Sequence, residues 1–162
     1  MNINNFLLLF AFGVIVGAFL FIKQKIEKVK KEYRYDKKDF LLTPSEHKFF
    51  DALVKAVSDE YLIFPQIHLS ALINHRVKGQ NWKGAFSHIN GKSVDFVLCD
   101  KNYISPKLAI ELDDRSHELE DRQERDGIVE NILKNAGVPL LRIKNQENFN
   151  PDDIKREISS FL

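Results

Sequence analysis

Three acidic residues interrupt two apolar segments in the middle of the chain. Asp95 lies within residues 93–99, and Glu111 and Asp113 lie within residues 107–113. Both segments have the composition of strands, and their short separation favours an antiparallel hairpin. In such a hairpin the three carboxylates converge at one end of the sheet. Clustered carboxylates repel one another unless a positive charge neutralises them.

A hard divalent ion such as Mg²⁺ or Mn²⁺ neutralises such a cluster and prefers oxygen ligands. The ion can also activate a water molecule and stabilise charge on a phosphodiester. We therefore expect Asp95, Glu111 and Asp113 to be metal ligands and catalytic residues of a hydrolytic site. The competing interpretation is that acids at strand ends are simply solvated. Against it, Asp95 and Glu111 each stand between strongly apolar neighbours.

Regular strand alternation predicts the surroundings of these acids. One face of the first strand is expected to carry Val94, Phe96 and Leu98, with Asp95 on the opposite face. In the second strand, Ile110 and Leu112 are expected to share a face, and Glu111 and Asp113 to share the other.

Three more polar residues are candidates for catalytic roles at the same site. Glu46 lies on the apolar stripe of a predicted helix, so it could point inward as well as cap that helix. Gln66 shares a strand face with Phe64 and His68 in regular alternation. His117 follows the second acidic strand by four residues. It could move a proton or contact a substrate phosphate, or it could be only a polar residue at a helix start.

A basic segment with one aromatic residue is a candidate nucleic-acid contact. It carries Arg76, Lys78, Trp82 and Lys83, and the indole could stack on a base. A solvated basic loop explains the same residues equally well. Arg142 interrupts an apolar strand, so it could be a buried partner for a carboxylate or a contact for a nucleic-acid phosphate.

The helices and strands that carry these residues can be predicted in chain order. Thr43 at the N-cap, Pro44 at N1 and Glu46 at N3 form a capping box that opens a helix. A strand is expected at 62–69, followed by an unclear segment at 70–92 with a short helix near Leu72 and a turn at Asn90-Gly91. Next come strands at 93–99 and 107–113, a helix at 120–136 that ends at Gly137, and a buried central strand at 139–143. The last element is a helix after Asn150-Pro151, with Ile154, Ile158 and Phe161 on its apolar face. This order predicts a three-layer α/β sandwich with a mixed central sheet.

The first 22 residues form a separate segment. Residues 6–22 contain no charged side chain, and at 1.5 Å per residue they extend roughly 25 Å, which is enough for a short membrane span. Lysines follow this run immediately, so we expect a bilayer anchor with the N-terminus outside and the C-terminal domain in the cytoplasm. In a bacterium this membrane would be the inner membrane. The alternative is a cleaved signal peptide, but no basic residue precedes the run and no small-x-small site follows it.

The charge distribution separates a linker from a domain. Residues 23–40 carry eight cations and four anions, a net charge of +4, in a chain whose net charge is +1. The remainder therefore carries −3, which argues against broad, nonspecific coating of DNA. The expected organisation is an anchor at 1–22, a basic juxtamembrane linker at 23–40 and an α/β domain at 41–162. The single cysteine, Cys99, excludes an intrachain disulfide and any multi-cysteine zinc site.

The acidic strands and the segments after them resemble a known family. The residues that carry the resemblance are Val94-Asp95-Phe96-Val97, Ala109 to His117, Asp126, Leu133, Gly137 and Leu141-Arg142-Ile143. This pattern is similar to an uncharacterised bacterial domain family that is often found behind a membrane segment. That family is similar in turn to the restriction-endonuclease-like PD-(D/E)xK nucleases, including the very-short-patch-repair branch. The resemblance covers about residues 40–146.

The resemblance implies a restriction-endonuclease-like fold with Asp95 and Glu111 as ligands of Mg²⁺ and Glu46 as an accessory. In those nucleases a lysine two residues after the glutamate positions the attacking water. Here Asp113 occupies that slot, an anion in place of a cation. Lys107 lies on the same strand face as Glu111, but it is roughly 13–14 Å from Glu111 along the strand. Arg115, Arg125 or His117 would then have to supply the positive charge.

Three functions remain as hypotheses. The first is a membrane-anchored nuclease that uses Mg²⁺ or Mn²⁺ to hydrolyse phosphodiesters of DNA or RNA. The second is a catalytically inactive nuclease fold that recruits nucleic acid or protein to the membrane, which the Asp113 departure favours. The third is a structural role in which the acids are internal hydrogen-bond partners.

Overall fold

The computed structural model of the chain describes residues 2–27, 33–113 and 120–162. It divides into two compact units, Met1–Lys38 and Asp39–Leu162. The first unit contains α1 (Ile3–Glu27). Its segment Ile3–Lys23 has a mean hydropathy of 2.5 and is not buried against other parts of the chain. By length and composition this helix could cross a membrane, a property that anchors and signal sequences share.

The second unit is built on a mixed sheet of four strands in the order β1-β2-β3-β4. The strands are β1 (Tyr61–His68), β2 (Ser93–Asp100), β3 (Pro106–Asp113) and β4 (Leu140–Lys144). The pairs β1–β2 and β2–β3 are antiparallel, which confirms the predicted hairpin of the two acidic strands. The pair β3–β4 is parallel, as the intervening helix allows.

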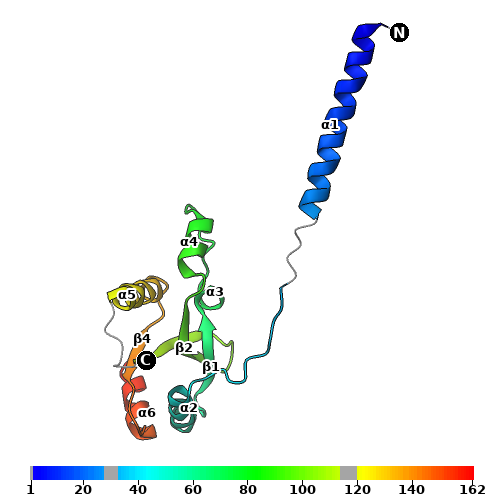
Figure 1. Cartoon of the computed structure of the whole chain (residues 1–162). Helices are drawn as coiled ribbons and strands as arrows, with labels where there is room; N and C mark the ends of the chain where they lie inside the picture. Colours follow the sequence, from blue (N-terminus) through cyan, green and yellow to red (C-terminus); the bar gives the residue numbers. More distant parts are fainter. Residues whose placement is uncertain (1, 28–32, 114–119) are drawn as a thin grey trace. The chain divides into compact units, whose positions relative to one another are not determined.

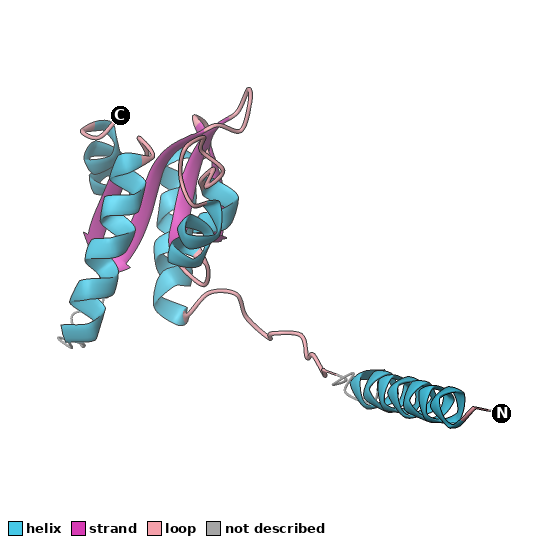
Figure 2. Cartoon of the chain, turned by 90° about the horizontal axis from the view of Figure 1, so that it is seen from above, coloured by secondary structure: helices cyan, strands magenta, loops and turns pink. Residues whose placement is uncertain are grey.

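Helices cover both faces of the sheet, so the predicted mixed α/β architecture is confirmed (Figure 1). One face packs against α2 (Pro44–Val57) and α6 (Pro151–Ser159). The other packs against α3 (Leu69–Leu72), the end of α4 (Trp82–Ile89) and α5 (Glu120–Asn135). Figure 2 shows the strands side by side with helices packed across them.

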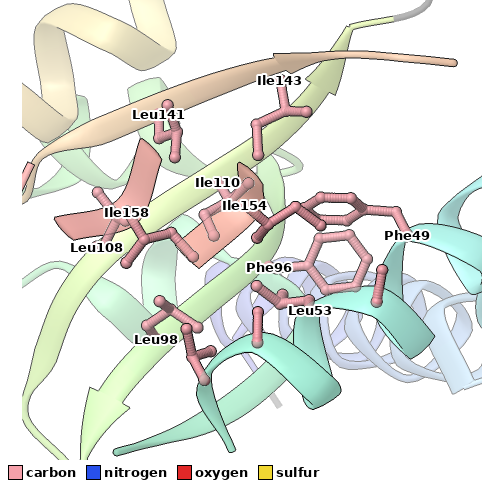
Figure 3. Close-up of a cluster of buried hydrophobic side chains, with 13 residues drawn as sticks. Phe49, Leu53, Phe96, Leu98, Leu108, Ile110, Leu141, Ile143, Ile154 and Ile158 are labelled. Carbon is pink, nitrogen blue, oxygen red and sulfur yellow. The ribbon is translucent and has the colours of Figure 1, made fainter. Parts of the chain in front are cut away.

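The larger core lies between the sheet and the pair α2 and α6 (Figure 3). Phe49 of α2 and Phe96 of β2 are both fully buried, with ring centroids 5.3 Å apart. Leu53 lies beside them and is also fully buried. The second core lies under α5, where Leu133 is fully buried. The predicted apolar stripes of α2 and α5 therefore pack these helices on opposite faces of the sheet.

Strand directions bring the polar candidates to one end of the sheet. The end of β1 and the start of β2 are neighbours, and the ends of β3 and β4 lie at the same end because β3 is antiparallel to β2 and parallel to β4. The first turn of α2 also reaches this end, since Ser45 donates a hydrogen bond of 2.5 Å to Asn145, just after β4.

Two predictions about the C-terminal elements were wrong. The strand predicted to be central, β4, is an edge strand. Its residues Leu141 and Ile143 are nevertheless buried, because α6 and the large core cover their face whether or not another strand follows. Phe161 was expected on the apolar face of the last helix, but α6 ends at Ser159 and Phe161 is 45% exposed.

The predicted alternation fails at one point, where Val94 packs in the core under α5 and Phe96 and Leu98 pack in the core under α2. The same break occurs opposite, in β1. Gln66 has a φ of 52°, in the left-handed region, and both Phe64 and Ile67 pack under α5. A left-handed residue twists a strand and re-aims side chains, which a regular period of two does not anticipate.

A candidate carboxylate site

Asp95 lies where β2 and β3 separate. The antiparallel ladder between these strands reaches Phe96 and Ile110 and is not continued toward Asp95. Beyond that pair, a side-chain contact replaces the backbone pairing: Asp95 Oδ2 accepts a hydrogen bond of 2.9 Å from the backbone N–H of Leu112. The aspartate is therefore held in the plane of the sheet by the neighbouring strand.

Glu46 reaches the same place from the first turn of α2. Its backbone N–H donates to the Thr43 hydroxyl at 3.3 Å, and its Oε2 accepts from the Thr43 N–H at 2.6 Å, which confirms the predicted capping box. Its Oε1 accepts a hydrogen bond of 2.9 Å from the side-chain amide of Gln66. Glu46 thus both caps α2 and points inward, and the kink at Gln66 brings that amide to it.

The environment of Asp95 raises the pKa of its carboxyl group. Burial is the largest cause, and the negative charges of Glu46 and Asp113 act in the same direction, as does a hydrogen-bonding contact with the Glu46 carboxyl group. The Leu112 N–H opposes these effects because it stabilises the charged form. The pair of Asp95 and Glu46 is therefore a place where a proton or a metal cation is favoured.

Glu111 and Asp113 are held by a different partner. The guanidinium Nη1 of Arg142, on the adjacent parallel strand, lies 3.1 Å from Glu111 Oε2 and 3.1 Å from Asp113 Oδ1. The pairing of Glu111 with Arg142 across β3 and β4 puts the cation beside both acids. Of the two roles predicted for Arg142, the structure contains the carboxylate contact.

Asp95 lies close enough to Asp113 for the charge of Asp113 to raise the pKa of Asp95, and Arg142 contacts both Asp113 and Glu111. Among the residues that the structure describes, no three His, Cys, Asp or Glu side chains are grouped as metal ligands. Asp95 and Glu46 nevertheless provide the hard oxygen donors that Mg²⁺ and Mn²⁺ prefer.

The predictions for the other charged residues have separate outcomes. Arg115 and His117 lie outside the described residues, as does the side chain of Arg125. Lys107 pairs with Asp100 at 3.6 Å, at the opposite end of the hairpin from Asp95. Sequence reasoning missed Asn145, which joins β4 to α2, because a lone asparagine in a loop carries no periodic signal.

The basic segment is built around α4 and is not part of the carboxylate cluster. Arg76 and Lys83 lie over the ring of Trp82, with the guanidinium carbon 5.7 Å and the ammonium nitrogen 5.6 Å from the ring centroid. Trp82 is 49% exposed. The helix α4 was not predicted, because its eight residues include Gly84 and lack a long apolar period.

Fold and site together define an α/β domain whose mixed four-stranded sheet gathers carboxyl groups at one end. Residues 38–161 match the family described as "Protein of unknown function (DUF2726)", so the chain belongs to this family. It is also similar to an uncharacterized protein of Haemophilus influenzae, with 26% identity over 136 residues, covering 78% of this chain and 68% of the relative. No solved structure matches the chain.

Proposed function

We propose that residues 39–162 form a metal-dependent phosphodiesterase of the restriction-endonuclease-like type, acting on DNA or RNA. The observation that carries this proposal is the position of Asp95. It is held at the fork of two strands, faces the carboxyl group of Glu46, and has a raised pKa. The resemblance makes Asp95 a metal ligand and Glu46 an accessory, and carboxyl groups brought together at one end of a sheet suit a metal-dependent hydrolase.

In this proposal Asp95 and Glu111 hold Mg²⁺ or Mn²⁺, and Glu46 and Gln66 position Asp95. When bound, the ion supplies Lewis acidity and lowers the pKa of a water molecule. Arg142 supplies the positive charge that Asp113 does not provide in the lysine slot. The Arg142 guanidinium lies 3.1 Å from Asp113, so a cation from the adjacent strand β4 lies beside the position of that lysine. His117 remains a proposed proton carrier.

The same proposal places the enzyme at a bilayer. We propose that α1 is a retained anchor, with the N-terminus outside and the domain in the cytoplasm. The support is the apolar run without a preceding charge and the lysines that follow it.

The test is a titration of Mn²⁺ into the full chain in nanodiscs, followed by incubation with DNA and RNA substrates. We expect binding by the wild type, and affinity at least about tenfold weaker for Asp95→Asn and Glu111→Gln. Asp51→Asn is the matched control, because Asp51 is an exposed acid on α2. Cleavage that survives in both site variants would show that the reaction happens elsewhere.

The second candidate is a nuclease fold without cleavage that binds nucleic acid at the membrane. The contact of Arg142 with both Glu111 and Asp113 favours it, because this guanidinium neutralises two of the three expected ligands without a metal. Nucleic-acid binding without Mn²⁺ binding or cleavage would select this candidate. Metal binding without any action on nucleic acid would contradict it.

A further inference from the structure

One continuous part of the domain has no acidic residue. Residues 61–94 contain no aspartate and no glutamate, and they carry the cations Arg76, Lys78, Lys83 and Lys92. Their net charge of +4 lies within residues 41–162, whose net charge is −3, so the rest of that domain carries −7. Such a separation of charge within one domain favours the attraction of a polyanion to its basic part.

The cations belong to an arm, residues 69–92, that is inserted between β1 and β2 and contains α3 and α4. The arm is fixed at its two ends, since Leu69 is fully buried and Ile89 is 4% exposed in the core under α5. Asn81 caps α4 by accepting a hydrogen bond of 3.2 Å from the Gly84 N–H. The arm therefore has a packed base and a defined helix.

The outer part of the arm exposes aromatic and apolar groups among its cations. Val77 is 58% exposed, Trp82 49% and Phe86 39%. Two of the arm's cations lie over the Trp82 ring, since Arg76 and Lys83 are both less than 6 Å from its centroid. Exposed aromatic rings next to cations are the elements of single-strand binding, because bases stack on the ring and phosphates pair with the cations.

The arm starts and ends beside the carboxylate site. It leaves the sheet after His68, two residues beyond Gln66, and returns at Ser93, two residues before Asp95. In Figure 1, α4 extends beyond the strands on the opposite side of the sheet from α2. A strand of nucleic acid bound along this arm would be directed to the end of the sheet where β2 carries Asp95.

We propose that the arm is a binding surface for single-stranded nucleic acid. The inference rests on the proposed phosphodiesterase function for the class of its ligand. A single strand fits better than a duplex, because an exposed indole stacks only on a base that is not already stacked in a helix. An anionic lipid surface is the other partner that a basic, aromatic arm would attract, but the continuity of the arm with the carboxylate site favours nucleic acid.

Trp82 is the single tryptophan of the chain, so the tryptophan fluorescence of the protein reports on the arm. The experiment uses the full chain in nanodiscs of neutral phosphatidylcholine with EDTA present, so that binding is measured apart from any metal-dependent reaction. Oligo(dT) is the ligand. We expect quenching of Trp82 emission on addition of oligo(dT), and an increase in anisotropy of the labelled oligonucleotide.

Variants assign the binding to the arm. Trp82→Ala is expected to weaken binding by about tenfold, the effect of one stacked base. Arg76→Gln with Lys83→Gln is expected to reduce the slope of log affinity against log salt by about 1.4, since each phosphate contact contributes about 0.7 on single strands. Lys48→Gln with Lys55→Gln is the matched control, because both lysines are exposed on α2. A thermal melt of each variant confirms folding.

Several results would overturn the inference. One is the absence of oligo(dT) binding, and another is binding that the arm variants leave unchanged. A third is a shift of Trp82 emission that appears only when the nanodiscs contain phosphatidylglycerol, because the arm would then be a lipid contact. Failure of the proposed hydrolysis can be told apart from failure of this inference. If the wild type cleaves no substrate, but the wild type and the Asp95→Asn variant both bind oligo(dT), the arm is a binding surface without an associated hydrolysis.

Discussion

At the scale of single residues, the site depends on which partner each carboxyl group has. Asp95 is bound by a backbone N–H and faces Glu46, whereas Glu111 and Asp113 share the guanidinium of Arg142. The two situations have opposite electrostatics. Crowding and burial penalise the charge on Asp95, whereas Glu111 and Asp113 each have the Arg142 guanidinium as an ion-pair partner.

Asp95→Asn is expected to make the protein more thermally stable at neutral pH when a chelator removes metals. The pKa of Asp95 is raised in the folded state, mainly by burial, above its ordinary value of 3.8. Ionisation therefore costs stability above the folded-state pKa, and this cost disappears as the pH falls below 3.8. The melting temperatures of the wild type and the variant, measured between about pH 4 and about pH 7.5, test this prediction. A variant that is less stable at neutral pH would contradict the stated cause.

Arg142→Gln is expected to lower the stability of the domain by about 1–2 kcal/mol, between the values for exposed and buried ion pairs. The reason is that Glu111 and Asp113 would then lose the cation that lies 3.1 Å from each. Mn²⁺ should recover more stability in this variant than in the wild type, because it can replace the lost charge. Thermal melts with and without Mn²⁺ test this, and equal shifts in both proteins would argue against a metal position beside these acids.

At the scale of elements, short local signals determine where the polar residues lie. The capping box that starts α2 directs Glu46 toward the sheet end, and the left-handed residue Gln66 interrupts β1 at the level of Asp95. The irregular end of the β2–β3 ladder leaves a backbone N–H for Asp95. The site is therefore assembled at the ends and irregularities of elements rather than along their regular parts.

Thr43→Ala is expected to destabilise the domain by about 0.5–2 kcal/mol, the ordinary cost of losing an N-cap. It should also loosen Glu46, which bonds to Thr43 through both its backbone and its side chain. Chemical denaturation measures the first effect, and a change in the Mn²⁺ affinity of the folded protein measures the second. Thr43→Ser keeps the hydroxyl and is the control. Equal stability of the alanine and serine variants would show that the cap is not needed.

At the scale of the whole molecule, a unit with one long apolar helix is joined to an α/β unit with a polar sheet end. The α/β unit is held by two cores on opposite faces of its sheet, with Leu53 and Leu133 fully buried in them. Under the proposal that α1 is a retained anchor, the α/β unit would act only on molecules that come to the membrane.

The proposed topology predicts different labelling of two engineered cysteines in intact cells. Asn2→Cys should react with a membrane-impermeant maleimide, whereas Asn102→Cys, in the exposed β2–β3 turn, should react only after permeabilisation. The native Cys99 gives little background, because it is 5% exposed and burial raises the pKa of its thiol. Loss of the Asn2→Cys label together with a shorter mature chain would indicate cleavage of α1.

The elements whose signals are local could be predicted from the sequence. The capping box at Thr43, the hairpin of the acidic strands, the glycine at Gly137 with a φ of 73°, and the apolar segment of α1 were all predictable, because each depends on residues close together in the chain. Three features became known only from the folded domain: Val94 leaves the face of Phe96, β4 lies at an edge, and Arg142 contacts both Glu111 and Asp113. These features depend on strand order, on packing from both faces and on a kink at Gln66, and a periodic pattern contains none of that information.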